Sequence, residues 1–213
     1  MVSRTLRVDP NKPSINAIEE AVNILRSGGV IMYPSDTVYG LGSDALNSDA
    51  VQRIFRIKGR SPDQSLPLIV SDRKMTESLA FVDDRAKKLM DTFWPGALTI
   101  IMMKKPIVPS VVVGGGTSVG LRMPDHAVPL LLLRMSGFPI VSTSANKHGR
   151  PHSVEVEEAI RQIGGEVDLI LDAGRVGGQP STIIDMTMKH PSIIRSGPVT
   201  KEMIEKVIGS LGF

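Results

Sequence analysis

The sequence contains no cysteine, few aromatic residues and no long apolar run. The absence of cysteine from the 213 residues excludes a disulfide framework, a thiolate metal site and a cysteine nucleophile, and agrees with a reducing cytoplasm. Aromatic residues make up 4% of the chain, too few for a surface that stacks successive bases of a single strand. Glycine and proline break the apolar stretches, as in residues 107–121, before they reach the ~18 residues of a membrane span. We therefore expect a cytoplasmic protein without a membrane segment.

The remaining composition is that of an ordinary globular protein. Hydrophobic residues make up 41% and charged residues 22%, and the length fits one domain, which we expect to occupy residues 1–213. The formal net charge is +3. This small surplus of positive charge could be spread over the surface or gathered in a cleft that holds a polyanion, and the number alone does not choose between them.

Helical and extended patterns alternate along the chain. Apolar spacing and capping residues predict helices that begin near Ser14, Ser48, Asp84, Val128, Val154 and Thr200. Short apolar runs predict strands at residues 30–33, 68–70, 98–102, 119–123, 140–141, 169–171, 183–186 and 193–194. The irregular spacing of these elements favours an α/β fold with an open, mixed sheet over a regular βαβ repeat.

Five polar clusters lie at the ends of the predicted strands and helices. They are residues 34–41, 58–60, 114–122, 142–146, and 181–182 taken together with 195–197. Loops beyond strand ends form the usual ligand crevice of an open α/β sheet. Each cluster by itself is also compatible with a turn, a loop or a helix cap, whereas the occurrence of all five at such positions indicates a ligand site.

The clusters contain the side chains that bind phosphate. Lys58 and Arg60 flank Gly59 and can converge on one anion, although an isolated pair of this kind is more often a solvated helix end. Arg122 lies inside an apolar strand, where burial requires a partner. Hydroxyl and amide groups in residues 142–146 can satisfy phosphate oxygens without adding charge.

Several catalytic patterns are missing from the sequence. There is no P-loop, no G-x-S-x-G elbow and no metal-ligand spacing, and we expect the four scattered histidines to be ordinary surface or loop residues: His126, His148, His152 and His190. Cations, hydroxyls and flexible glycines suit charge stabilisation of a polyphosphate better than covalent catalysis. The residues therefore indicate a nucleotide- or phosphate-binding enzyme whose substrate stays open.

The order of the motifs resembles that of the YrdC-like family of threonylcarbamoyl-AMP synthases. The resemblance runs from about residue 15 to residue 200. It is carried by Tyr33–Leu41, Lys58 with Arg60, Phe93–Gly96, Val119–Pro124, Ser144 with Asn146, Ser181–Thr182 with Asp185, and Arg195 with Gly197. Each motif is weak alone, whereas seven in order are specific.

The resemblance implies an open, twisted α/β sheet with a deep, positively charged groove. It also implies a nucleotidyltransferase that makes L-threonylcarbamoyladenylate and pyrophosphate from L-threonine, bicarbonate and ATP. A tRNA threonylcarbamoyl transferase machinery would then use this product to modify the adenosine beside the anticodon. An RNA-binding relative without adenylate synthesis and a related carbamoyl-adenylating enzyme are the two alternatives.

The resemblance also implies roles for individual residues. The residues expected to bind ATP are Lys58, Arg60, Ser118, Ser144, Asn146 and Arg195, and Lys58 and Arg60 are the expected catalytic residues. The residues expected to bind threonine are Ser35, Gln64, Arg122 and Ser181, and Arg122 would pair with the amino-acid carboxylate. No protein metal site is expected, while Mg²⁺ is expected on the ATP phosphates. Ser35, Gln64 and His152 depart from the usual family residues.

Overall fold

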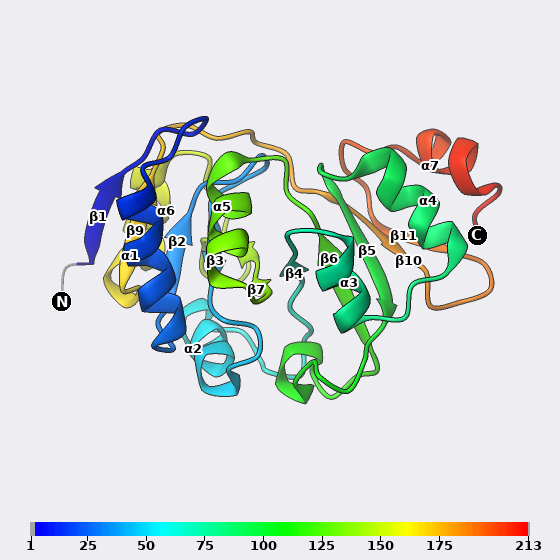
Figure 1. The fold of residues 1–213 in the computed structure, drawn as a ribbon, viewed down its shortest axis with the longest axis horizontal. Coiled ribbons are helices and arrows are strands. Elements are labelled where there is room, and N and C mark those ends of the chain that lie inside the picture. The colour runs from blue at the N-terminus through cyan, green and yellow to red at the C-terminus, as the bar shows by residue number, and fades with distance from the viewer. Residues whose placement is uncertain (1–2, 213) are drawn as a thin grey trace.

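A computed structural model describes residues 3–212, which form two β-sheets surrounded by helices (Figure 1). The first sheet has five strands in the order β1-β9-β2-β3-β8. Their bounds are β1 Arg4–Arg7, β9 Leu169–Asp172, β2 Ile31–Tyr33, β3 Gly40–Gly42 and β8 Thr143–Ser144.

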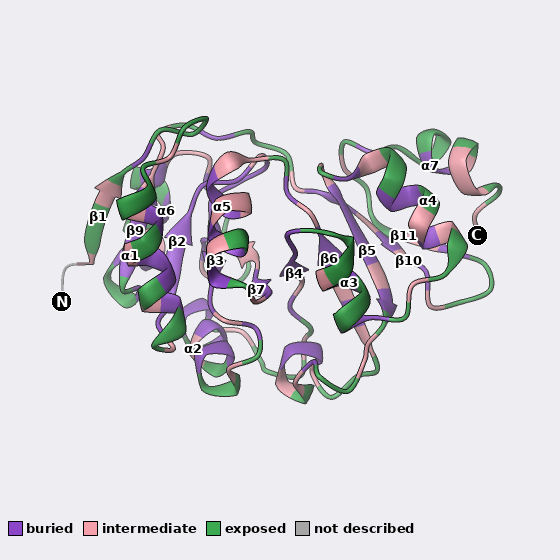
Figure 2. Cartoon of the chain, in the orientation of Figure 1, coloured by how far each residue is buried: buried purple, intermediate pink, exposed green. Residues whose placement is uncertain are grey.

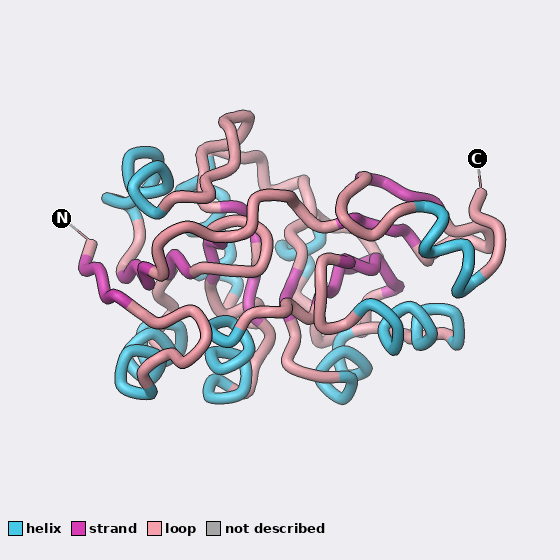
Figure 3. Tube along the Cα trace, turned by 90° about the horizontal axis from the view of Figure 1, so that it is seen from above, coloured by secondary structure: helices cyan, strands magenta, loops and turns pink. Residues whose placement is uncertain are grey.

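The second sheet has six strands in the order β11-β10-β5-β6-β4-β7. Their bounds are β11 Ser192–Arg195, β10 Thr182–Asp185, β5 Leu98–Met103, β6 Ser118–Arg122, β4 Leu68–Ile69 and β7 Ile140–Val141. Seen from above, the two groups of strands lie side by side along the long axis, with loops running between them (Figure 3).

Both sheets are mixed, as the sequence predicts. In the first sheet β9 pairs in parallel with β1 and β2, whereas β3 is antiparallel to β2 and β8. In the second sheet the pairs β10–β5 and β4–β6 are parallel and the pairs β5–β6, β10–β11 and β4–β7 are antiparallel. The strands are divided between two sheets instead of the single sheet expected from the sequence. The chain passes directly from the second sheet to the first at Ser142, which alone separates β7 from β8.

Seven α-helices and two short 3₁₀ segments are found among residues 3–212. The helices are α1 Ile15–Arg26, α2 Ser48–Lys58, α3 Arg73–Leu79, α4 Asp84–Phe93, α5 Ala127–Ser136, α6 Val156–Ile163 and α7 Lys201–Ile208. The 3₁₀ segments are η1 Ser110–Val113 and η2 Gly164–Glu166. None of these helices is long and apolar enough to cross a membrane.

Capping residues explain where several of the helices begin. Thr200 accepts a hydrogen bond from the Met203 amide at the start of α7, as expected. Ser14 precedes α1, but its side chain makes no capping bond. The prediction that Ser48 caps α2 is wrong by one residue, because the Asn47 side chain accepts the amides of Asp49 and Ala50. Asparagine and serine cap helices about equally well, so propensity alone does not separate two such neighbours.

The hydrophobic core extends through both sheets. Its larger cluster joins Met32 and Leu41 of the first sheet to Leu98, Ile100 and Leu121 of the second. A smaller cluster lies where α1 and α5 pack together against the first sheet (Figure 1). The central strands are buried and the outer faces of the helices are exposed (Figure 2). Because one cluster of buried side chains joins both sheets, the loops between the sheets are anchored to the same core at both ends.

The glycines of β3 make room for a buried tyrosine on the neighbouring strand. The ring of Tyr33 lies across β3, where a Cβ atom on Gly40 would be 2.7 Å from the ring carbon Cζ. The Tyr33 hydroxyl donates a hydrogen bond of 2.9 Å to the Ser142 Oγ atom between the two sheets. Burial raises the pKa of Tyr33 to about 12, so this hydroxyl keeps its proton at neutral pH.

Substitution Gly40→Ala is therefore expected to destabilise the protein. The added methyl group overlaps the Tyr33 ring, and overpacking of a core typically costs about 1–3 kcal/mol. Urea unfolding followed by circular dichroism measures the loss. Gly165→Ala is the matched control, because a Cβ atom at Gly165 meets no atom within 4 Å. Equal stability of the two variants would contradict the packing argument.

Candidate active site

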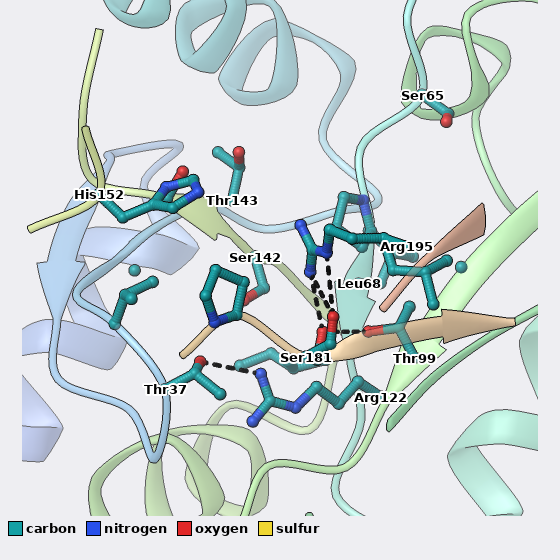
Figure 4. Close-up of a pocket in the computed structure, with 18 of the residues that line it drawn as sticks. Thr37, Ser65, Leu68, Thr99, Arg122, Ser142, Thr143, His152, Ser181 and Arg195 are labelled. Atoms are coloured by element: carbon teal, nitrogen blue, oxygen red, sulfur yellow. Dashed lines mark hydrogen bonds between the residues drawn. The ribbon is translucent and has the colours of Figure 1, made fainter. Parts of the chain in front are cut away.

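A cavity of about 610 Å³ lies between the two sheets (Figure 4). Its wall is built from the segment after β2, the end of α2, the strands β4, β5 and β6, the loop after β8, and the strands β10 and β11. The volume lies within the range of small-molecule sites. The polar clusters recognised in the sequence meet at this place.

The charged side chains that line the cavity are all cationic. They are Lys58, Arg60, Arg122, Arg150 and Arg195, and no aspartate or glutamate of residues 3–212 lies in the lining. Serine and threonine hydroxyls make up much of the remaining polar surface. A concave site with charge of one sign concentrates a ligand of opposite charge. The arrangement therefore suits a polyanion.

Lys58 is the last residue of α2 and is almost fully buried. Its ammonium nitrogen Nζ donates to the carbonyl oxygens of Ser144, at 2.7 Å, and Asn146, at 2.9 Å, and to the Asn146 Oδ1 atom at 3.1 Å. These bonds use all three N–H groups. Burial, together with the nearby Arg60 charge, lowers the pKa of Lys58 to about 8. Lys58 therefore fixes the loop after β8 and adds a charge behind it.

Gly59 turns the chain between Lys58 and Arg60. It adopts a left-handed conformation with φ of 63° and ends α2. The Arg60 guanidinium then donates from Nε to the Gln64 Oε1 atom at 2.6 Å and from Nη2 to the Ser65 carbonyl at 3.1 Å. Burial lowers the pKa of Arg60, but the group stays ionised. Its remaining N–H groups are available to a ligand in the cavity.

The loop after β8 is held by its own side chains. Ser144 donates from Oγ to the Asn146 Oδ1 atom at 2.6 Å, and Asn146 donates from Nδ2 to the Arg150 carbonyl at 2.6 Å. The Asn146 side chain is buried. The dense run of polar residues in the sequence thus forms an ordered turn that also lines the cavity.

A second network joins β5, β10 and β11 on the opposite wall. Arg195 donates to the Ser181 carbonyl from Nε at 3.0 Å and from Nη2 at 2.8 Å (Figure 4). The Ser181 hydroxyl lies 2.9 Å from the Thr99 hydroxyl. Burial and the nearby Arg122 charge lower the pKa of Arg195. Arg195 also donates from Nη2 to the Ser181 hydroxyl at 3.2 Å, so Thr99 and Arg195 together fix this hydroxyl at the surface of the cavity.

Arg122 is the last residue of β6, and its buried charge is paired with the carboxylate of Asp36. Its Nη2 atom donates to the Asp36 Oδ2 atom at 2.6 Å, Nη1 to the Thr37 Oγ1 atom at 3.1 Å, and Nε to the Gly96 carbonyl at 2.9 Å. Ser35, in the same segment, donates to the Val38 carbonyl at 2.7 Å. This corner of the cavity thus joins the segment after β2 to the second sheet.

Nine of the ten predicted site residues line this one cavity, and Gln64 does not. Gln64 instead lies beside Arg60 and accepts its Nε hydrogen. The proximity of the nine is a property of the fold, whereas their roles toward particular ligands stay predictions.

The cavity is also lined by residues to which sequence reasoning assigned no ligand. Thr37, Thr99, Thr143, His148 and His152 lie in the lining. Thr99 carried a signal, since it is a hydroxyl residue within an apolar strand. His152 carried a signal only through the family resemblance, in which it departs from the usual residue, whereas the isolated position of His148 resembles that of a loop residue. Burial and the nearby cations Arg195 and Lys58 lower the pKa of His152, so it is predominantly neutral at pH 7.

Comparison with known proteins identifies the family. Residues 23–197 match the Sua5/YciO/YrdC family model, which is described as "Telomere recombination". The chain belongs to this family. The resemblance found in the sequence is thereby confirmed, and so is the α/β fold class.

Family members with a named activity are similar over nearly the whole chain. The threonylcarbamoyl-AMP synthase of Bacillus subtilis is 40% identical, in a match that covers 99% of this chain and 61% of that protein. The synthase of Pyrococcus abyssi is 38% identical over 91% of this chain and 58% of its own length. The crystal structure of P. abyssi Sua5 complexed with L-threonine superposes with a TM-score of 0.93 at 36% identity, covering 99% of this chain and 62% of that one. This chain therefore spans about three fifths of these relatives.

A family member of similar length has no named activity. The uncharacterized protein YciO of Escherichia coli is 32% identical, in a match that covers 92% of this chain and 96% of that protein. Its crystal structure superposes with a TM-score of 0.86 over the same shares of the two chains. Family membership therefore fixes the fold, and the activity has to be argued from the cavity.

The lowered pKa of Lys58 predicts how anion binding to the cavity depends on pH. Above about pH 8 Lys58 loses its proton, so one positive charge disappears and a polyphosphate anion, for which ATP is the probe, is expected to bind more weakly as the pH rises further. ATP itself does not titrate there, because phosphate groups lose their last proton near pH 6. Calorimetric titration of ATP from pH 7 to 9.5 at constant ionic strength measures the decline. Lys58→Met should bind weakly at every pH, and a flat profile for the unsubstituted protein would contradict the prediction.

Proposed function

We propose that this chain synthesises L-threonylcarbamoyladenylate from L-threonine, bicarbonate and ATP, with release of pyrophosphate. The observation that carries the proposal is the cavity with five lining cations and no lining carboxylate among the described residues. Its likeness to the P. abyssi structure complexed with L-threonine supports an amino acid as the second ligand. A triphosphate requires the positive charge, and the hydroxyl-rich walls supply hydrogen bonds to both substrates.

We divide the cavity into two ends, which meet where Arg195 contacts Ser181. We assign ATP to the end formed by Lys58, Arg60 and Arg195, to which Ser118, Ser144 and Asn146 add hydrogen-bonding groups. We assign threonine to the end formed by Ser35, Arg122 and Ser181, where the forked guanidinium of Arg122 can pair with the amino-acid carboxylate. Gln64 acts on the amino acid only indirectly in this assignment, since it contacts Arg60.

The reaction needs alignment and charge stabilisation more than a protein nucleophile. The threonine amine attacks the carbon of bicarbonate and water leaves, which gives a carbamate. A carbamate oxygen then attacks the α-phosphorus of ATP, and the bond to the β-phosphate breaks with its electron pair leaving on pyrophosphate. Lys58 and Arg60 stabilise negative charge on the phosphates, and we assign them the catalytic role for this reason.

Magnesium fits this scheme as part of the ATP substrate. Mg²⁺ prefers oxygen ligands, mainly carboxylates and phosphates. Among residues 3–212 no group of three or more histidine, aspartate or glutamate side chains could hold a metal ion, and no carboxylate lines the cavity. The residues present do not fit a dedicated metal site, so we propose that the ion is held by ATP phosphate oxygens and water.

The wider role follows from the chemistry of the product. A mixed anhydride of a carbamate and a phosphate is an activated acyl donor, so we propose that a tRNA threonylcarbamoyl transferase machinery consumes it in the cytoplasm. We also propose that residues 1–213 act as one catalytic domain, because residues of both sheets line the cavity.

The substrate requirement tests the proposal directly. Purified protein is mixed with ATP, L-threonine and bicarbonate, and pyrophosphate is measured together with the mass of the adenylate. We expect pyrophosphate only when all three substrates are present, together with the mass of threonylcarbamoyladenylate. ATP binding without either product would reject the proposed reaction, and RNA binding would then be measured as the alternative activity.

Separate substitutions of Lys58 and Arg60 by alanine are expected to reduce kcat/KM for ATP by about 100-fold or more, because each removes a charge that stabilises the transition state. Arg56→Ala is the matched control, since Arg56 is an exposed cation in the last turn of α2 that does not line the cavity. Thermal unfolding shows whether each variant is folded. Activity of a folded Lys58→Ala or Arg60→Ala variant equal to that of Arg56→Ala would contradict the assignment.

A further inference from the structure

The cations of the cavity differ in how their hydrogen bonds are satisfied. The N–H groups of Lys58, Arg60 and Arg195 donate to backbone carbonyls, side-chain amide oxygens and a serine hydroxyl. These acceptors are neutral, so they hold the cations in place without cancelling their charge. None of the three residues forms an ion pair among residues 3–212, so no paired carboxylate offsets their charge.

Arg122 is different because its partner is a carboxylate. The Arg122–Asp36 ion pair joins Nη2 and Oδ2 at 2.6 Å, and the two side chains are only 10% and 16% exposed. It is the most buried ion pair found among residues 3–212. At this depth salt screens the pair little, so Asp36 offsets most of the Arg122 charge.

The position of Asp36 is fixed by the fold. Asp36 follows β2 of the first sheet, whereas Arg122 ends β6 of the second, so the pair joins the two sheets behind the cavity. Gly177 packs tightly against the same segment, because a Cβ atom there would lie 2.3 Å from the Asp36 carbonyl oxygen. The Asp36 Oδ1 atom is buried and has no hydrogen-bond partner among the described residues. Asp36 itself does not line the cavity.

The remaining donors of Arg122 match a carboxylate. A guanidinium has five N–H groups, and the contacts to Asp36, Thr37 and Gly96 use one each on Nη2, Nη1 and Nε. One N–H group on each terminal nitrogen remains. Two N–H groups on the two terminal nitrogens can hold a carboxylate in a bidentate manner.

We propose that Asp36 is a positioning residue that sets the charge selectivity of the Arg122 end of the cavity. By orienting the guanidinium and offsetting its charge, Asp36 lets this end accept the carboxylate of a zwitterionic amino acid and reject phosphate. Coulomb repulsion scales with charge, so Asp36 repels a doubly charged phosphate about twice as strongly as a carboxylate at the same place. It also attracts the ammonium group of the amino acid. This inference rests on the proposed assignment of threonine to Arg122.

The experiment measures competition between inorganic phosphate and L-threonine by calorimetry. In the unsubstituted protein we expect phosphate to occupy the Lys58 and Arg60 end and to leave the threonine Kd unchanged. In Asp36→Asn, phosphate should also occupy the uncompensated Arg122, so the apparent threonine Kd should rise about tenfold in excess phosphate. Asp36→Ser removes the charge without placing an amide donor against Arg122, and it should give the same result if Asp36→Asn does not fold.

Three controls separate a charge effect from loss of structure. Asp36→Glu keeps the charge and should show no phosphate competition, and the double variant Asp36→Asn/Arg122→Ala should lose the additional bound phosphate along with the guanidinium, which direct titration of phosphate measures. Asp91→Asn changes an exposed ion pair with Arg73 and should behave like the unsubstituted protein. If the neutral variants weaken threonine binding equally with and without phosphate, Asp36 is only a structural support and the inference is overturned.

Failure of the proposed function would give a different result. If the unsubstituted protein does not bind L-threonine at all, the assignment of threonine to the Arg122 end of the cavity is rejected. The number of phosphate ions bound per chain then decides the role of Asp36. An additional phosphate in Asp36→Asn, lost again in the double variant, would support charge compensation at Arg122. Equal numbers in the unsubstituted protein and Asp36→Asn would overturn it.

Discussion

Several positive charges are held around one cavity without a lining carboxylate to neutralise them, and the rest of the site depends on this arrangement. The fold holds Lys58, Arg60 and Arg195 with neutral oxygen acceptors that satisfy their N–H groups and leave their charge intact. Burying such charges is unfavourable, as the lowered pKa of Lys58 indicates. Binding of the proposed ATP substrate would relieve this cost, and this relief would contribute to affinity and, in the proposed reaction, to transition-state stabilisation.

The two-sheet architecture explains how the charges converge. Each sheet contributes a short, rigid set of strand ends to the cavity, and the segment after β2 contacts β6 of the second sheet through the Arg122–Asp36 pair. The Tyr33–Ser142 hydrogen bond joins β2 to the residue between β7 and β8, where the chain passes from one sheet to the other. In the proposed function, the cavity therefore places an amino acid and a nucleotide side by side, each at the end assigned to it. A chemistry that depends on alignment requires this rigidity more than it requires any single reactive group.

The elements that the sequence predicts are those with strong local signals. The apolar runs of β2, β5, β6 and β9 and the amphipathic helices α1, α4 and α7 lie close to their expected positions. The strands β1, β3 and β8 were missed: β1 is mostly exposed and polar, β3 is Gly-Leu-Gly, and β8 has two hydroxyl residues. Helix α3 was missed because it is short and carries little apolar periodicity. Pairing with a neighbour, which is not a local property, decides the conformation of such segments.

By itself, the sequence determined the chemical inventory: the motifs in their order, the cations, the hydroxyls, and the family to which they belong. Tertiary structure alone decided which of these groups meet. It brought nine predicted residues into one cavity and left Gln64 outside the lining, where its side chain accepts a hydrogen bond from Arg60. It also paired Arg122 with a carboxylate 86 residues away along the chain. Residue type and local spacing follow from the sequence directly. Contacts between distant segments depend on how two sheets pack over a shared core, and local sequence patterns do not predict that packing.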